Sequence, residues 1–273
     1  MNKLVPTMSS IAPTAKIYPN VRLGAGVRID DWAVVGLPAA GASPWDMETI
    51  IGDGAVIRSH TTIYGGSRIG PRFQTGHRAV VGPCMDIGAG CSIGTSSVTS
   101  GFAKLHDGAR IHSVCFVDYF AAVQEDAWVG PSAIVESRLD KVTVVGAGAI
   151  LALKVHLFPG IRVGERALIG TRSVLRKDIP PYRLVIGNPP RAVRTIDQIV
   201  SPIADIGRPY KPDPPDVQEA NFARHTLRYG CELSANDWRV EMWDRLHAVE
   251  AAVAESDWTL GPALEQGTAV DVA

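Results

Sequence analysis

An aliphatic residue or threonine returns at every sixth position through much of the first 175 residues. The step has no exception over the run that comprises Ile51, Ile57, Ile63, Ile69, Thr75, Val81, Ile87, Ile93, Thr99, Leu105, Ile111, Val117, Val123, Val129 and Val135. Gly or a small or polar residue usually follows each of these positions. So strict a period is typical of a repeat solenoid, and a period of six predicts a parallel β-helix. We therefore expect an all-β solenoid with this column of residues in its core.

The repeat begins near the N-terminus and is interrupted twice. It already holds at Ile11, Ile17, Leu23, Ile29 and Val35. It pauses over residues 37–49, where Pro and Gly indicate a loop that leaves the solenoid. Residues 136–144 shift the phase, after which the step resumes at Val145 and continues to Leu175.

The pattern divides the chain into three parts. We expect the β-helix over residues 1–195, a Pro-rich linker over 196–216 and a helical C-terminal extension over 217–273. Apolar residues at the three-and-four spacing of a helix indicate the extension: Trp238, Met242, Leu246, Val249 and Val253.

The outward-facing positions can be assigned to three faces. Three hexapeptides make one coil of about 18 residues, so residues 18 apart should stack at the strand spacing of about 4.8 Å. One face then carries Thr62, Val80, Val98, Phe116 and Ile134; a second carries Arg68, Asp86, Lys104 and Ala122; the third carries Val56, Gln74, Ser92, Arg110 and Trp128. The first is an apolar stripe that needs a cover, either a partner subunit or the C-terminal helices. A cyclic homotrimer would be the natural closed assembly for such a face.

Bulk composition excludes several classes of protein. With 27 Lys and Arg against 28 Asp and Glu, the chain lacks the basic excess of a nucleic-acid-binding protein. No stretch of about 20 apolar residues predicts a membrane span, and no secretory signal is visible at the N-terminus. The four Cys have irregular spacing, which argues against a disulfide framework or a zinc ribbon. We therefore expect a cytoplasmic protein that binds neither nucleic acid nor membrane.

Three of the seven His gather near one corner of the expected prism. His60, His77 and His112 follow core residues of one stacked column: Ile57, Thr75 and Ile111. His77 and His112 should lie two coils, or about 10 Å, apart, and at a subunit interface they could line one cleft from opposite walls. Histidine is suited to general base work near neutral pH, so we expect a catalytic base among these three.

Other catalytic chemistries find little support in the sequence. No Gly-x-Ser-x-Gly elbow, phosphate-binding loop or dinucleotide fingerprint is present. The corner histidines lack a tight ligand spacing such as His-x3-His, so no metal site is expected.

Four segments show a resemblance to a known family. They are Ile57-Arg58-Ser59-His60-Thr61-Thr62-Ile63-Tyr64, Phe73-Gln74-Thr75-Gly76-His77, Arg110-Ile111-His112-Ser113, and the closing Asp178 to Arg191 with its Gly187-Asn188-Pro189-Pro190. With the repeat, over about residues 11–195, the chain resembles the hexapeptide-repeat acyltransferases. The second and third segments look most like the branch that N-acylates nucleotide-linked amino sugars.

The resemblance implies a left-handed β-helix, a homotrimer and acyl-CoA, commonly acetyl-CoA, as co-substrate in a groove between neighbouring subunits. A His would take the proton from the amine or hydroxyl of a small acceptor, with His77 as first choice, His112 as second and His60 as a further candidate. Residues expected to contact CoA are Gly170 and Ser173 through their backbone amides, and Arg172, Arg176, Lys177, Arg191 and Arg194 through its phosphates. The loops 37–49 and 136–144 would face the acceptor.

Two other functions remain open. A metal-dependent lyase like the γ-class carbonic anhydrases shares the coil, although the pair His106 and His112 is one residue too far apart for that family's His-x4-His. A non-catalytic trimeric scaffold is the third interpretation. The sequence names neither the acyl group nor the acceptor.

Overall fold

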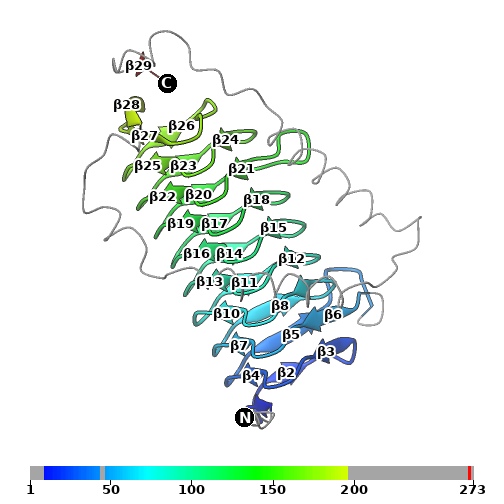
Figure 1. Cartoon of the computed structure of the whole chain (residues 1–273). Helices are drawn as coiled ribbons and strands as arrows, with labels where there is room; N and C mark the ends of the chain where they lie inside the picture. Colours follow the sequence, from blue (N-terminus) through cyan, green and yellow to red (C-terminus); the bar gives the residue numbers. More distant parts are fainter. Residues whose placement is uncertain (1–8, 44–46, 196–269, 272–273) are drawn as a thin grey trace, which may run out of the picture.

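A computed structural model describes residues 9–43, 47–195 and 270–271. This part of the chain consists of short strands joined by turns, wound into a long three-sided coil (Figure 1). The strands form three sheets of 12, 9 and 8 strands, here called sheets A, B and C. The all-β solenoid predicted from the sequence is confirmed. The predicted linker at 196–216 and helical extension at 217–273 lie outside the described residues, apart from the strand at 270–271.

The strands of each sheet come from successive coils. Sheet A contains β1 (Ser10–Ile11), β4 (Arg28–Ile29), β7 (Val56–Ile57), β10 (Gln74–Thr75), β13 (Ser92–Ile93), β16 (Arg110–Ile111), β19 (Trp128–Val129), β22 (Ile150–Leu151), β25 (Leu168–Ile169), β27 (Arg183–Ile186), β28 (Arg191–Thr195) and β29 (Val270–Asp271). Sheet B contains β2 (Lys16–Ile17), β5 (Val34–Leu37), β8 (Thr62–Tyr64), β11 (Val80–Val81), β14 (Val98–Thr99), β17 (Phe116–Val117), β20 (Ile134–Val135), β23 (His156–Leu157) and β26 (Val174–Leu175). Sheet C contains β3 (Val21–Leu23), β6 (Thr49–Ile51), β9 (Arg68–Ile69), β12 (Asp86–Ile87), β15 (Lys104–Leu105), β18 (Ala122–Val123), β21 (Val144–Val145) and β24 (Arg162–Val163).

Residues 18 apart pair directly in the regular coils, as predicted. Gln74 pairs with Ser92, Ser92 with Arg110, and Arg110 with Trp128, all in parallel register. The six-residue column points inward and is buried, with Ile57, Ile93 and Ile111 at most 1 % exposed. Burial of this apolar column drives the coil to close, and the alternation along each short strand leaves its preceding residue on the outer face.

The corners require a left-handed backbone conformation at one residue each. Between sheets A and B this residue is His60, Arg78, Ser96, Val114 and Ser132 in successive coils, with φ between 56° and 61°. Glycine accepts such a φ without strain, whereas a β-branched residue does not. Val114, at φ 61°, is therefore a strained position.

Two insertions interrupt the coil. Val35 pairs with Ile63 rather than with residue 53, so ten residues are inserted between β5 and β6. Val135 pairs with Leu157 rather than with residue 153, so four residues are inserted between these two strands. Within this insertion Arg138 forms a β-bridge with Lys141.

The coil ends in an antiparallel pair. β27 and β28 pair antiparallel, and β29 joins β28 in the same sense. The described residues contain no helix long and apolar enough to cross a membrane.

Candidate functional site

The corner between sheets A and B carries the three histidines expected there, at different depths. His60 is exposed and occupies the left-handed position of its turn. His77 is also exposed, and its Nδ1 lies 2.8 Å from the hydroxyl oxygen of Ser59 in the preceding coil. His77 therefore has a hydroxyl partner that can orient its ring.

His112 lies two coils beyond His77 and is half-buried. The backbone N–H of Ser113 donates to its Nδ1 at 2.8 Å. Because Nδ1 is the acceptor, the neutral imidazole carries its proton on Nε2. The ring also meets Trp128 edge to face, with 5.8 Å between the ring centroids. His112 is thus held as a hydrogen-bond donor through Nε2.

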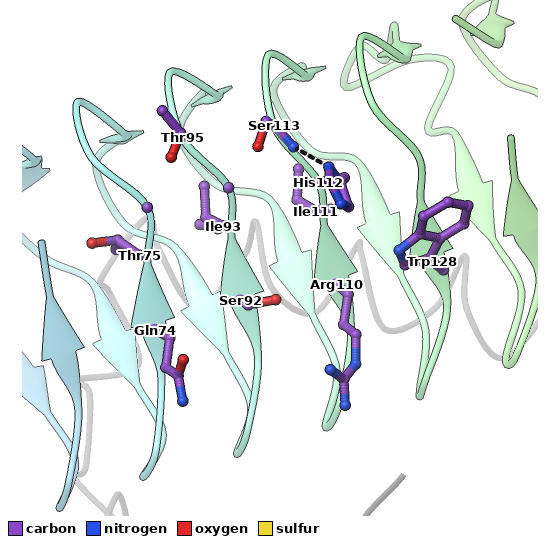
Figure 2. A pocket seen from close by; sticks show the side chains of 12 residues that line it. Gln74, Thr75, Ser92, Ile93, Thr95, Arg110, Ile111, His112, Ser113 and Trp128 are labelled. Atoms are coloured by element: carbon purple, nitrogen blue, oxygen red, sulfur yellow. Dashed lines mark hydrogen bonds between the residues drawn. The ribbon is translucent and has the colours of Figure 1, made fainter. Parts of the chain in front are cut away.

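A groove of about 220 Å³ opens on the outer face of sheet A beside this corner (Figure 2). Its lining residues are Gln74, Thr75, Gly76, Ser92, Ile93, Gly94, Thr95, Arg110, Ile111, His112, Ser113 and Trp128. The hollow forms because small Ser92 lies between the longer side chains of Gln74 and Arg110 on paired strands.

Glycine is required at the groove's rim by the close stacking of the coils. A Cβ on Gly76 would lie 2.2 Å from the backbone nitrogen of Thr95, and a Cβ on Gly94 would lie 2.5 Å from the carbonyl carbon of His112. Side chains at these positions would separate the coils, so the rim remains bare backbone and gives access to His112.

The groove has two chemically different ends. Figure 2 shows Thr95, His112 and Ser113 on the corner side, while the guanidinium of Arg110 and the amide of Gln74 extend to the opposite side. The lining residues include no carboxylate. The groove therefore offers an imidazole at one end and a cation at the other.

The groove itself was not predicted as the site. The sequence pattern placed Gln74, Ser92, Arg110 and Trp128 in one outward column, which the register confirms. The signal that could have revealed the groove is the small residue between two long ones in that column. The prediction directed attention instead to the apolar face of sheet B.

The expected CoA contacts lie near the C-terminal end of the coil. Gly170, Arg172 and Ser173 share the corner of His112, three coils further on. The amides proposed as donors to CoA are already used: Gly170 N–H donates to Val185 O, and Ser173 N–H to Gly170 O. The Ser173 side chain is buried, and its hydroxyl oxygen accepts from Gly187 N–H at 3.0 Å. Any contact of these residues with CoA must use other atoms.

The basic candidates are divided between several places. Arg172 is exposed on the corner between sheets A and B, whereas Arg176 and Lys177 are exposed on the next corner, after β26. The guanidinium of Arg176 lies over the ring of Phe158, 4.6 Å from its centroid. Arg191 and Arg194 belong to β28.

An imidazole–carboxylate pair near β23 was not singled out by the sequence. His156 Nε2 lies 2.6 Å from Glu136 Oε1, and the His156 ring stacks on Phe158 with 4.8 Å between centroids. Glu136 begins the four-residue insertion, so this pair ties the insertion to the coil.

Burial makes two of the three described cysteines poor nucleophiles. Cys84, Cys91 and Cys115 are buried and reduced. Burial raises the pKa of the Cys115 thiol to about 11 and that of Cys91 further still. These thiols are therefore protonated near neutral pH, and the thiolate is the reactive form. Within residues 9–43 and 47–195, no group of three or more His, Cys, Asp or Glu could hold a metal ion.

The predicted apolar stripe is present on sheet B. Val98, Phe116 and Ile134 form adjacent in-register positions there, and each is between 37 and 38 % exposed. Val114, on the neighbouring corner, is 60 % exposed. Large apolar side chains that remain exposed in a row are typical of an interface.

Sequence comparison places this chain near curated acetyltransferases. It is 32 % identical over 111 residues to a chloramphenicol acetyltransferase from Escherichia coli, covering 40 % of this chain and 50 % of that protein. A chloramphenicol acetyltransferase from Klebsiella aerogenes is 32 % identical over 108 residues, covering 40 % and 50 %. The chain thus matches about half the length of these relatives. No protein-family model matches the chain.

Structure comparison supports the same fold. A UDP-N-acetylglucosamine acyltransferase from Bacteroides fragilis 9343 superposes with a TM-score of 0.54 at 20 % identity, covering 93 % of this chain and 94 % of that one. Together with the curated relatives, this likeness confirms the resemblance to hexapeptide-repeat acyltransferases that the sequence showed.

Proposed function

We propose that this protein is an acyltransferase that moves an acyl group, acetyl in the simplest case, from acyl-CoA to an amine or hydroxyl of a small acceptor. The observation that carries the proposal is the similarity to a chloramphenicol acetyltransferase over 111 residues. The histidine corner beside an open groove supports it, because acyl transfer to an amine or hydroxyl needs a base at the attacking atom.

The reaction has one bond formed and one broken at the thioester carbon. The acceptor nitrogen or oxygen attacks the carbonyl, its proton passes to a base, and the CoA thiolate leaves after the tetrahedral intermediate collapses. The thiolate then takes up a proton, so charge balances over the cycle. A hydrogen-bond donor near the carbonyl oxygen would stabilise the negative charge that develops there.

The hydrogen bonds of the two histidines favour different roles. His77 can donate from Nδ1 to Ser59 Oγ, which leaves the Nε2 lone pair available as the base. His112 accepts at Nδ1 and carries its proton on Nε2, so it suits the donor role toward the carbonyl oxygen. His60, exposed one coil before His77, is the remaining candidate for proton transfer.

The separation of these histidines favours a shared site between subunits. Two coils correspond to about 10 Å, which is too far for both rings to act on one carbonyl within a single chain. In a homotrimer packed through the stripe of Val98, Phe116 and Ile134, His77 of one subunit and His112 of its neighbour could line one cleft. Arg172, Arg176, Lys177, Arg191 and Arg194 are proposed to meet the CoA phosphates, with Gly170 and Ser173 beside the pantetheine arm.

The acceptor is proposed to be a small molecule, with a nucleotide-linked amino sugar as the working case. Support comes from the two segments that resemble this branch of the family, Phe73-Gln74-Thr75-Gly76-His77 and Arg110-Ile111-His112-Ser113. Most of their residues line the groove: Gln74, Thr75, Gly76, Arg110, Ile111, His112 and Ser113.

Calorimetry with acetyl-CoA and free CoA, with metal content measured on the same sample, tests the proposal. We expect saturable binding of both, followed by transfer to at least one amine in an acceptor screen. Stoichiometric zinc or iron without CoA binding would overturn it in favour of the γ-carbonic-anhydrase-like lyase. Neither CoA nor metal binding would favour a scaffold.

A further inference from the structure

The groove contains a buried hydrogen-bond donor without an acceptor. The indole nitrogen of Trp128 is one of two buried side-chain nitrogen or oxygen atoms among the described residues for which no hydrogen-bond partner is found. A buried N–H without an acceptor costs free energy, and such groups are rare in native proteins. An acceptor brought by a bound molecule would remove that cost.

A cation lies next to this donor. Arg110 is the in-register neighbour of Trp128 on the adjacent strand, and both side chains are on the outer face of sheet A. Gln74 adds an amide further along the same column. No carboxylate lines the groove, so its electrostatic character favours a ligand with oxygen acceptors and negative charge.

The positions of these groups distinguish the two ends of a ligand. Figure 2 shows the Arg110 guanidinium directed away from the corner of His112 and Ser113, and the indole nitrogen on the side of the Trp128 ring that faces Arg110 and His112. We propose that the groove selects acceptors that carry an anionic group, phosphate or carboxylate, together with the amine or hydroxyl to be acylated. Arg110 pairs with the anion, the indole N–H of Trp128 donates to one of its oxygens, and the reacting group lies toward His112.

Ligand entry requires a small movement of the groove wall. The indole nitrogen is covered in the structure, so an oxygen reaches it only after a neighbouring side chain shifts. Arg110, on the strand paired with that of Trp128, has several rotatable bonds, so its reorientation toward the anion is part of the proposal.

This inference rests on the proposed function for its acceptor, but its first test measures binding alone. The protein labelled with 15N at tryptophan gives one indole N–H signal for each of its six tryptophans. The Trp128 signal is identified by its loss in Trp128→Phe, which retains a large aromatic ring. The probes are glucosamine, glucosamine 6-phosphate, 2-amino-2-deoxyglucuronic acid and free CoA.

We expect the Trp128 signal to move with glucosamine 6-phosphate or the amino-uronic acid and to remain in place with glucosamine. The two anionic probes separate phosphate from carboxylate recognition. A signal that moves with none of the probes, or equally with glucosamine, overturns the inference. A signal that moves with free CoA alone also overturns it, because the groove would then hold the acyl donor. Movement with an anionic amine in a protein that transfers no acyl group would preserve the inference and reject the proposed function.

Kinetics with the preferred anionic amine provides the second test. Trp128→Phe loses one hydrogen bond to a charged group, so the KM for the anionic amine should rise about tenfold. Arg110→Gln should raise the same KM by at least this factor. The KM for acetyl-CoA should remain unchanged in both. Trp32→Phe, at an exposed corner near the N-terminus, is the matched control and should leave both KM values unchanged. Equal losses for the anionic and neutral amines would contradict anion recognition.

Discussion

The Nδ1 atom of His77 and the hydroxyl oxygen of Ser59 lie 2.8 Å apart, on consecutive coils of one corner. The contact exists because residues 18 apart stack in the regular coil, so Ser59 comes directly before His77 in space as well as in the repeat. It gives the proposed base a hydroxyl partner that can orient its ring.

Replacement of His77 by Asn should lower kcat by roughly 10²- to 10⁴-fold, the range for removal of a general base. Ser59→Ala should produce a smaller loss, about three- to tenfold in kcat, because the ring remains but loses one orienting hydrogen bond. Steady-state kinetics across pH measures both effects. Ser100→Ala, on a different corner, should retain wild-type kinetics. Full activity in His77→Asn would assign the base elsewhere, with His60 the first residue to examine.

Replacement of His112 by Gln should lower kcat but preserve the dependence of rate on pH. A donor to the carbonyl oxygen stabilises the transition state without titrating as the base, and loss of one such donor costs roughly 10²- to 10³-fold in kcat. The dependence of rate on pH that the general base produces should therefore persist in His112→Gln and be lost in His77→Asn. The opposite result would exchange the two roles.

Enlargement of Ser92 should close the groove. Ser92→Leu places an apolar side chain between Gln74 and Arg110, so we expect the acceptor KM to rise at least about tenfold. Acetyl-CoA binding by calorimetry should be little affected. Val56→Leu, in the same outward column but outside the groove, is the control for added volume. An unchanged acceptor KM in Ser92→Leu would show that the acceptor binds elsewhere.

A charge on the apolar stripe should disrupt the proposed trimer. Phe116 is flanked in register by Val98 and Ile134, so Phe116→Glu would bury a carboxylate among apolar groups at the interface. Sedimentation should show three chains for the wild type and one for the variant. Arg22→Glu, an exposed change on sheet C, should leave the assembly intact. Unaltered assembly in Phe116→Glu would exclude this stripe as the interface.

Relief of the strain at Val114 should stabilise the coil. Its φ of 61° disfavours a β-branched side chain, and Asn tolerates this conformation better. Val114→Asn should therefore raise the free energy of unfolding by about 1 kcal/mol. Guanidinium unfolding measures the change, with Val98→Asn, on strand β14, as the control that should not stabilise. If Val114→Asn is less stable than the wild type, the contacts of the valine side chain stabilise the fold by more than its left-handed backbone conformation destabilises it.

The six-residue step determined the coil, its inward column and its register. In each regular coil the residue before an inward aliphatic position faces outward. Periodicity alone therefore predicted one outward column of Gln74, Ser92, Arg110 and Trp128. The shared corner of His60, His77 and His112 followed in the same way. In a solenoid the spacing of residues in the sequence gives their relative positions in space, because each coil contacts only its neighbours.

Tertiary structure decided what those residues can do. The sequence could not show that Ser113 N–H occupies Nδ1 of His112, that Ser59 meets His77, or that the amides of Gly170 and Ser173 are already bonded within the coil. Nor could it show that Ser92 leaves a hollow beside a buried indole N–H. These features depend on side-chain rotamers and on hydrogen-bond distances of about 3 Å, which a repeat period does not specify. The sequence by itself therefore determined the fold and the outward columns, whereas three-dimensional packing decided the groove and the tautomer of His112.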